Sequence, residues 1–337
     1  MSIYILGIES SCDDTAAAVF CDNVMLSNVI AGQDIHRLYG GVVPEYASRA
    51  HQQNIIPVIE QCLIKAKINK KNIHAVAFTR GPGLLGSLLV GTSFAKAFAL
   101  GLGIPLIEVD HIHAHVLSHF IVEQGNDKAI PPFPFLCLVV SGGHTQIILV
   151  KSHFEMEVIG QTIDDAAGEA FDKGAKILGL PYPGGQMVDK NALGGNPHAF
   201  TLPEPAVGEL DFSFSGLKTS FLYLVRDHLK INPNFIEENL ANLCASLQYS
   251  IVKILTGKLE NAVRKTGITH VAVSGGVSAN SALRSALLQG QAENKWTAYI
   301  PATVYSTDNA AMVAVTGYYK YISNRFAAQN TSPYTRT

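Results

Sequence analysis

Short apolar runs alternate along the chain with longer stretches in which apolar residues recur every three or four positions. The short runs predict strands, and they fall at residues 4–8, 16–20, 73–78, 106–109, 135–140, 146–150 and 270–273. The helical spacing predicts longer helices at residues 45–66, 84–102, 239–263 and 310–321. Strands that alternate with helices indicate an α/β fold.

One arrangement of elements occurs twice. A strand, a small polar loop and a returning strand are predicted at residues 4–20, and the same order is predicted again at residues 135–150. We interpret this recurrence as a weak internal repeat, and two sheets that each open with such a hairpin are typical of a duplicated nucleotide-binding fold. The proline-rich stretch at residues 131–134 is a rigid linker and predicts a boundary between two lobes.

The length of 337 residues is enough for two lobes. We expect an N-terminal lobe at residues 1–130, completed by a C-terminal helix at residues 310–325. The C-terminal lobe is expected at residues 131–309, and residues 326–337 are expected to form a polar tail that frays.

Composition and charge narrow the class of protein. Hydrophobic residues make up 47% of the chain and charged residues 15%, which predicts a large core and a weakly charged surface. The formal net charge of -2 gives no overall basic field, so a nucleic-acid contact would need a local patch. One basic cluster exists, although such a cluster is more often a solvated face: Lys65, Lys67, Lys70 and Lys71.

The first residues and the cysteines favour a cytoplasmic protein with no membrane contact. The chain begins without a basic region and leads directly into a predicted strand, unlike a signal peptide. The five cysteines are scattered without a C-x-x-C pair, which is typical of reduced thiols. Glycines and Lys96 interrupt the apolar stretch at residues 84–102, so we expect a buried core helix there rather than a membrane span.

The strongest chemical signal is a run of histidines at residues 111–115, directly after Asp110 at a predicted helix N-cap. His111 and His115 are four residues apart and share a helix face, which suits two ligands of one metal ion. The alternative is a polar helix face whose histidines bond to backbone or water. A pair of histidines is an incomplete metal site, so a carboxylate from elsewhere in the chain is expected to complete it.

Two Ser-Gly-Gly loops follow predicted strands, at residues 141–143 and 274–276. Without side chains, backbone N–H groups can approach phosphate oxygens, so both loops are candidates for nucleotide binding. Asn280 could bond a base or ribose, or could simply cap a helix. The acidic segment at residues 164–172 could hold a ribose or an ammonium group, or could be a solvated helix start.

Two further motifs are weaker evidence for a functional site. Residues 81–86 match the pattern G-x-G-x-x-G, but Pro82 removes a backbone donor, so we favour tight turning and helix packing over dinucleotide binding. Residues 212–219 resemble a nucleophile loop around Ser213 and Ser215, yet the sequence places no histidine or aspartate partner beside them.

Several of these motifs together, in order along residues 3–322, resemble the bacterial TsaD family of tRNA N6-adenosine threonylcarbamoyltransferases, formerly described as O-sialoglycoprotein endopeptidases. The motifs that carry the resemblance are Gly7-Ile8-Glu9-Ser10-Ser11-Cys12-Asp13-Asp14-Thr15, Gly81-Pro82-Gly83, Asp110-His111-Ile112-His113-Ala114-His115, Val140-Ser141-Gly142-Gly143-His144-Thr145, Phe212-Ser213-Phe214-Ser215-Gly216-Leu217-Lys218-Thr219, Ser274-Gly275-Gly276-Val277 and Thr307-Asp308-Asn309.

The resemblance implies the actin-like ATPase fold of sugar kinases and Hsp70, with two lobes and a duplicated core. It also implies transfer of a threonylcarbamoyl group from threonylcarbamoyl-AMP to N6 of the adenosine 3′ to the anticodon, in tRNAs that read codons starting with A. The partners implied are tRNA, the inactive paralogue TsaB and the small ATPase TsaE.

The resemblance also assigns site residues. One divalent metal ion, usually iron in the family and with zinc and other ions left open, would be held by His111, His115 and Asp308. Some relatives have a metal-reaching tyrosine where this chain has Val139, so we expect three protein ligands. The donor substrate would be bound by Val139, Val140, Ser141, Gly142, Gly143, Asp172, Gly185, Asp189 and Asn280, and His144 is the candidate general base.

Three other classes remain as alternatives. A sugar-kinase-like phosphotransferase of the same fold would use an N-terminal aspartate with Mg²⁺, but Glu9 stands there and the histidine pair would be unexplained. A binding module like the inactive paralogue should lack the metal set. A metalloprotease fits poorly because the chain has no H-E-x-x-H motif.

Overall fold

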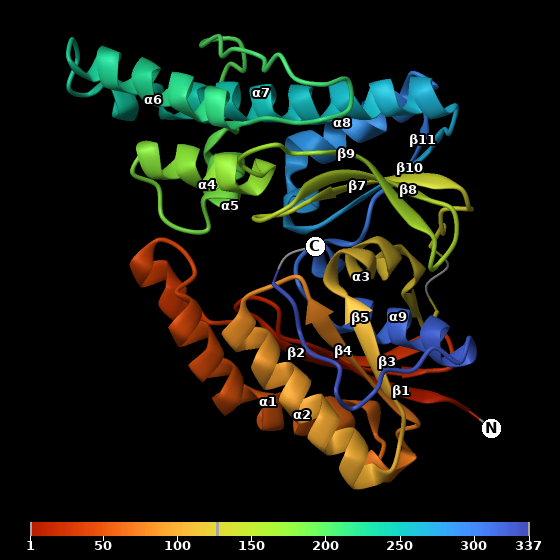
Figure 1. Cartoon of the computed structure of the whole chain (residues 1–337). Helices are drawn as coiled ribbons and strands as arrows, with labels where there is room; N and C mark the ends of the chain where they lie inside the picture. Colours follow the sequence, from red (N-terminus) through yellow and green to blue (C-terminus); the bar gives the residue numbers. More distant parts are fainter. Residues whose placement is uncertain (1, 126–127, 336–337) are drawn as a thin grey trace. The chain divides into compact units, whose positions relative to one another are not determined.

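The two predicted hairpins each lie at the centre of a β-sheet in the computed structural model, which describes residues 2–125 and 128–335 (Figure 1). The strands of the first sheet are β1 (Tyr4–Glu9), β2 (Thr15–Cys21), β3 (Val24–Ala31), β4 (Ala75–Gly81), β5 (Leu106–Asp110) and β6 (Val122–Glu123). Those of the second are β7 (Phe135–Val140), β8 (Thr145–Val150), β9 (Met156–Gln161), β10 (His270–Ser274) and β11 (Thr297–Tyr299).

The two sheets share one topology. The first has the order β5-β4-β1-β2-β3-β6, and the second has the order β11-β10-β7-β8-β9. In each sheet the first three strands pair antiparallel, and the next two add in parallel beside the first strand. The first sheet has one strand more, β6, which pairs in parallel with β3. The predicted repeat therefore extends beyond the hairpins to five strands, and the expectation of a duplicated core is confirmed.

The chain divides into two units, one of Met1–Ile130 with Thr307–Thr337 and one of Pro131–Ser306. This division differs from the expected lobes at two places. Residues 307–309 belong to the first unit, because they lead into the helix that packs on its sheet. The described part of the expected frayed tail also packs on the first unit, where the Ala327 N–H donates to the Leu106 carbonyl at 2.7 Å.

Helices cover both faces of the first sheet. They are α1 (Pro44–Ala66), α2 (Leu85–Leu102), α3 (His111–Leu117) and α9 (Ala310–Ile322), with short 3-10 turns at Asp34–Tyr39, Lys70–Asn72 and Ser118–Phe120. Because side chains alternate along a strand, Leu6 and Ile8 of β1 enter the core under α1 and α2. Gly7 of the same strand faces α9 instead, on the opposite side of the sheet.

Helix α2 is buried on one face only, which corrects the expectation of a buried core helix. Leu88, Ala95 and Ala99 are fully buried, whereas Leu89 and Leu100 are exposed. Among the described residues, α2 alone is long and apolar enough to cross a membrane, and 33% of its length is buried. One such helix is weak evidence for a membrane span, because a core helix of a soluble protein can meet the same test.

The second unit packs its helices around the long helix α7. They are α4 (Ala167–Ile177), α5 (Gly184–Asn191), α6 (Ser215–Leu229), α7 (Phe235–Thr266) and α8 (Ser281–Ala292), with 3-10 turns at Gly276–Ala279 and Thr303–Tyr305. Leu243, Leu247, Ile251 and Leu255 of α7 form a buried stripe at helical spacing. The sequence pattern predicted α7, offered the start of α4 as one reading of the acidic segment, and did not predict α5 or α6.

Helix α9 lies unusually close to the first sheet, and the close approach depends on glycine. A Cβ at Gly7 would lie 2.6 Å from the Ala314 backbone nitrogen, and a Cβ at Gly317 would lie 2.4 Å from the Ala77 Cβ. We therefore expect Gly7→Ala to destabilise the protein by about 1–3 kcal/mol, the usual cost of overpacking a core. Thermal or chemical denaturation measures this directly.

The matched control is Gly101→Ala, in α2, where a new Cβ would have no neighbour within 4 Å. This change should leave stability equal or slightly higher, because alanine is the better helix former. If Gly7→Ala unfolds at the same temperature as the wild type, α9 does not approach β1 as closely as the structure indicates.

Candidate metal centre and nucleotide-binding loops

Helix α3 presents His111 and His115 on one face at the end of β5. The Asp110 side chain caps the helix by accepting the His113 backbone N–H at 2.9 Å, as the sequence predicted. His115 is fully buried and His111 is 7% exposed. Their ring centroids lie 4.7 Å apart, so both imidazoles can reach one ion.

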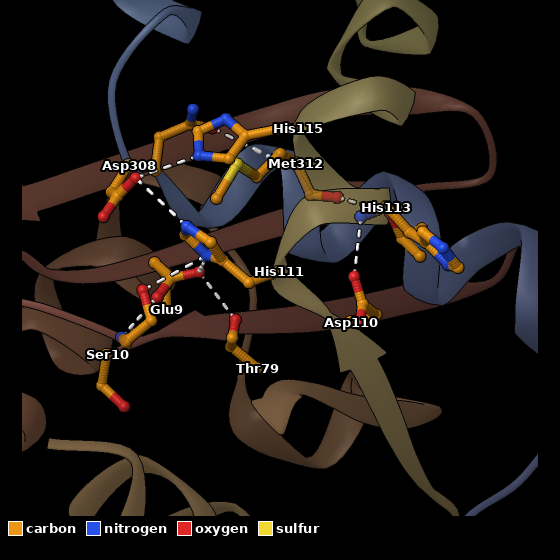
Figure 2. Close-up of polar contacts among 12 residues, drawn as sticks. Glu9, Ser10, Thr79, Asp110, His111, His113, His115, Asp308 and Met312 are labelled. Carbon is orange, nitrogen blue, oxygen red and sulfur yellow. Dashed lines mark hydrogen bonds and ion pairs between the residues drawn. The ribbon is translucent and has the colours of Figure 1, made fainter. Parts of the chain in front are cut away.

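Asp308 joins the two histidines from the residues just before α9. Its Oδ1 lies 3.1 Å from His115 Nε2 and 3.6 Å from His111 Nε2 (Figure 2). The next residue, Asn309, caps α9 by accepting the Met312 N–H at 3.1 Å, which fixes the backbone beside Asp308. One donor atom from each of the three residues lies within 4.8 Å of the other two, so the structure brings the three expected ligands together.

Glu9 orients His111, a role that the sequence did not reveal. The Glu9 carboxylate is fully buried at the end of β1 and lies 3.2 Å from His111 Nδ1. It also accepts the Thr79 hydroxyl at 2.7 Å and the Ser11 backbone N–H at 2.5 Å. An Nδ1–H that donates to this carboxylate leaves Nε2 as the nitrogen that can bind a metal once its own proton is lost. A lone acid in an otherwise apolar strand was the only sequence signal.

The charges around the pair fit a bound cation. Burial by itself lowers the pKa of His111. The carboxylates of Asp308 and Glu9 together have the larger, opposite effect and raise this pKa to about 9. Burial and then the charges of Asp308, Asp13 and Glu9 raise the pKa of Asp14 to about 7. A divalent ion would displace the His111 proton and relieve the repulsion among these acids. The donor set of two imidazoles and a carboxylate therefore suits a divalent transition metal.

The loop between β7 and β8 in the second unit is a tight turn closed by two hydrogen bonds. The Ser141 N–H donates to the His144 carbonyl at 2.8 Å, and the His144 N–H donates to the Ser141 hydroxyl at 3.1 Å. Gly142 and Gly143 are exposed, and a Cβ on either would meet no atom within 4 Å. Helix α4 begins against this loop, where the Gly168 N–H donates to the Ser141 carbonyl at 3.1 Å.

The residues on either side of this loop differ in the groups that they could present to a ligand. The side chains of Val139 and Val140 are fully buried in the sheet, so only their backbone could contact a ligand. His144 is half-buried, and its role as a general base stays a prediction.

The remaining predicted substrate residues lie in two groups within the second unit. Asp172 accepts the N–H groups of Gly184 at 2.8 Å and Gly185 at 3.3 Å, which holds the start of α5. Burial raises the pKa of Asp172, and these two hydrogen bonds oppose the rise. Asp189 accepts the Ser281 hydroxyl at 2.6 Å, beside Asn280.

Asn280 has the structural role that the sequence left open. Its Oδ1 accepts the Leu283 N–H at 3.0 Å and so caps α8, and its Nδ2 donates to Gln248 at 2.7 Å. Both contacts fix the side chain, which is 8% exposed. The cap therefore accounts for this asparagine within the fold, and substrate binding by it remains a proposal.

The weaker motifs also have structural explanations. The Ser213 hydroxyl donates to Asp164 at 2.5 Å, which ties the acidic segment to the start of α6 rather than forming a nucleophile site. Asp165 pairs with Lys173 at 3.0 Å and Lys218 at 2.8 Å. In the G-x-G-x-x-G run, a Cβ at Gly83 would lie 2.5 Å from the Ser11 carbonyl, so this glycine permits close packing.

Comparison with solved structures identifies the fold. Full-length HypF in the phosphate- and nucleotide-bound form superposes with a TM-score of 0.63 at 14% identity, covering 96% of this chain and 47% of HypF. The activator of the 2-hydroxyisocaproyl-CoA dehydratase from Clostridium difficile gives a TM-score of 0.53 at 13% identity, covering 96% of this chain and 97% of the activator. The chain thus has the α/β fold of the actin-like ATPases, as predicted.

Sequence comparison identifies the family among the proteins with this fold. The model of the TsaD family, described as tRNA N6-adenosine threonylcarbamoyltransferase, matches residues 24–315. Curated proteins with that name are similar over nearly the whole chain. The one from Christiangramia forsetii is 60% identical over 96% of this chain and 95% of its own length, and the one from Porphyromonas gingivalis is 60% identical over 99% and 98%. The chain belongs to the TsaD family, and the predicted transferase class is confirmed.

Replacing the two histidine ligands should remove the metal. We expect the wild-type protein to bind about one divalent ion per chain, and the double variant His111→Ala, His115→Ala to bind none, because one carboxylate alone is a weak site. Metal content after reconstitution and gel filtration, measured by mass spectrometry, tests this.

His113→Ala is the matched control, because His113 lies on the same helix and points away from the other two histidines (Figure 2). It should keep full metal content. A double variant that retains the metal would place the metal site elsewhere.

Glu9→Gln tests the orienting role of the buried carboxylate. Glutamine keeps the size of the side chain but removes the charge that favours the His111 Nδ1–H tautomer. Changes of this kind typically weaken metal binding about 10–100-fold. Competition with a chromophoric chelator gives the affinity, and circular dichroism shows whether the variant folds. An unchanged affinity in a folded variant would contradict the orienting role.

Proposed function

We propose that this chain transfers a threonylcarbamoyl group from threonylcarbamoyl-AMP to N6 of the adenosine 3′ to the anticodon, in tRNAs that read codons starting with A. The observation that carries the proposal is its 60% identity, over 96–99% of the chain, to curated tRNA N6-adenosine threonylcarbamoyltransferases. The His111, His115 and Asp308 cluster supports it, because an inactive paralogue would not need a complete ligand set.

The reaction joins an aromatic amine to a carbamoyl group. The adenine N6 attacks the carbamoyl carbon, the bond from that carbon to the phosphate oxygen breaks, AMP leaves and N6 loses one proton. This amine is a weak nucleophile, so correct positioning should supply much of the rate. The adenosine must also be accessible, which requires that it turn out of its base stack.

The chain's own residues can be given roles in this reaction. We propose that the backbone of residues 139–143, with Asp172, Gly185, Asp189 and Asn280, binds the adenylate. The exposed glycines Gly142 and Gly143 support a backbone contact with phosphate, because no side chain obstructs it. We propose that His144 accepts the proton that N6 releases.

The metal would be held by His111, His115 and Asp308, and we propose Fe²⁺, with Zn²⁺ as the second candidate for the same donor set. Bound there, it would act as a Lewis acid that stabilises the charge of the leaving AMP. Glu9 and Thr79 would keep the His111 ring in place during this step.

Family membership supports proposals for the partners and the compartment. We propose that the chain acts in the cytoplasm with the paralogue TsaB and the ATPase TsaE. A sugar-kinase-like phosphotransferase is not favoured, because Glu9 at the position of the kinase aspartate is fully buried against His111.

Transfer itself is the test of the proposed function. The chain, its two partners, threonylcarbamoyl-AMP and unmodified tRNA are incubated, and digested nucleosides are analysed by mass spectrometry. We expect threonylcarbamoyladenosine with the wild type and with His113→Ala, and a loss of at least about 100-fold with His111→Ala, His115→Ala, since loss of metal removes the Lewis acid. If metal-loaded wild type makes none, while a bacterial TsaD assayed in parallel does, the proposal is wrong.

A further inference from the structure

The C-terminal residues 327–334 are bound to the two strands that lead to the metal centre. The Ala327 N–H donates to the Leu106 carbonyl of β5 at 2.7 Å, in an isolated antiparallel bridge. The Tyr334 N–H donates to the Arg80 carbonyl of β4 at 3.2 Å. The segment is therefore attached at both of its ends, and we refer to residues 327–334 as the C-terminal segment.

Arg80 strengthens the attachment near the carboxyl ends of these strands. Its Nε donates to the Ser332 carbonyl at 2.8 Å, and its Nη1 pairs with Glu108 at 2.8 Å. The guanidinium also lies 5.4 Å from the centre of the Tyr334 ring, within the range of a cation–π contact. One side chain thus connects β4, β5 and the C-terminal segment.

Gly81 lets the segment approach the strand closely. A Cβ at Gly81 would lie 2.2 Å from the Tyr334 carbonyl oxygen and 3.0 Å from its ring. Tyr334 is therefore packed directly on the backbone at the end of β4, and its hydroxyl is directed by that packing.

The Tyr334 hydroxyl donates to Oδ2 of Asp110. The other oxygen of the same carboxylate, Oδ1, accepts the His113 N–H at 2.9 Å and caps α3. A single carboxylate therefore connects the C-terminal segment to the first turn of the helix that carries both histidine ligands. Helix α3 has only seven residues, so its first turn depends strongly on the cap.

We propose that Tyr334 is a positioning residue for the metal centre, acting through Asp110 on the first turn of α3. The inference rests on the proposed metal site. Asp308 is held separately, by the cap of α9 at Asn309. The distance between the His111 and Asp308 donor atoms therefore depends on how firmly Asp110 is held, and a metal site needs its ligands within about 0.5 Å of their correct places.

Tyr334→Phe is the variant that tests this, because it removes the hydroxyl and keeps the ring. Co²⁺ serves as the probe, since its visible absorption bands report the ligand geometry and its titration gives the affinity. We expect the Kd for Co²⁺ to rise about 3–10-fold, less than the 10–100-fold typical of a group bonded to a ligand itself, and the bands to shift. Tyr321→Phe, on α9 against Phe326, is the control and should change neither.

A double-variant cycle separates positioning from a general loss of stability. In Asp110→Ser the hydroxyl oxygen can still cap α3, but the side chain has no second oxygen to accept the Tyr334 hydroxyl. Adding Tyr334→Phe to Asp110→Ser should therefore have no further effect on the Co²⁺ affinity or spectrum. The unfolding temperature of each metal-free variant is measured alongside.

Each outcome of these measurements either supports or overturns the positioning role of Tyr334. A Kd for Tyr334→Phe within about twofold of wild type, smaller than the 10–100-fold range of orienting groups, would overturn the positioning role. So would an effect that persists undiminished in the Asp110→Ser background, or a lower unfolding temperature with unchanged Co²⁺ bands. If the wild type itself binds no Co²⁺, the metal site fails and the positioning role fails with it. Loss of the role alone leaves the wild-type site intact.

Discussion

A carboxylate with no access to water must be matched by hydrogen-bond donors or positive charge, because an unpaired buried charge is costly. Glu9 is such a group, and its donors are the Ser11 backbone, the Thr79 hydroxyl and the His111 imidazole. They come from the loop after β1, from β4 and from α3. One buried carboxylate therefore connects a loop, a strand and a helix of the first unit, and it favours Nε2 of His111 as the nitrogen available to a metal.

The position of the third proposed ligand, Asp308, depends on backbone packing rather than on charge. Asp308 precedes α9, and α9 can approach the sheet closely only because Gly7 and Gly317 have no side chains. The helix cap at Asn309 then fixes the turn beside Asp308. Two ligands from α3 and one from the start of α9 thus meet within one unit of the fold, which is what a site that relies on positioning requires.

The sequence predicted the parts of this site that depend on local spacing. His111 and His115 share a face because they are four residues apart, and Asp110 caps their helix. Asp308 lies 193 residues after His115, so spacing could not assign it, and only the family resemblance did. Glu9 could not be assigned as the partner of His111 because the contact depends on how β1 and α3 pack.

The polar tail and the acidic segment are two further places where the sequence could not predict contacts between distant residues. Polar composition predicted fraying after residue 325, but Arg80 and Asp110 hold that segment through contacts more than two hundred residues away in sequence. The sequence left open whether the acidic segment holds a ligand or is a solvated helix start, and in the structure Asp165 pairs with Lys173 and Lys218. The two hairpins, by contrast, lie where the sequence pattern predicted them, because short apolar strands carry their own signal. The pattern did not predict β3, β6, β9 or β11.

The most direct test of the metal centre is X-ray absorption spectroscopy and crystallography of the metal-loaded wild-type protein. The account predicts Nε2 of His111 and of His115 at about 2.0–2.1 Å from the ion and an Asp308 oxygen at about 2.0–2.2 Å. Glu9 should stay on the far side of the His111 ring, bonded to Nδ1. An ion bound through Nδ1 of His111, or bound directly by Glu9, would contradict the account.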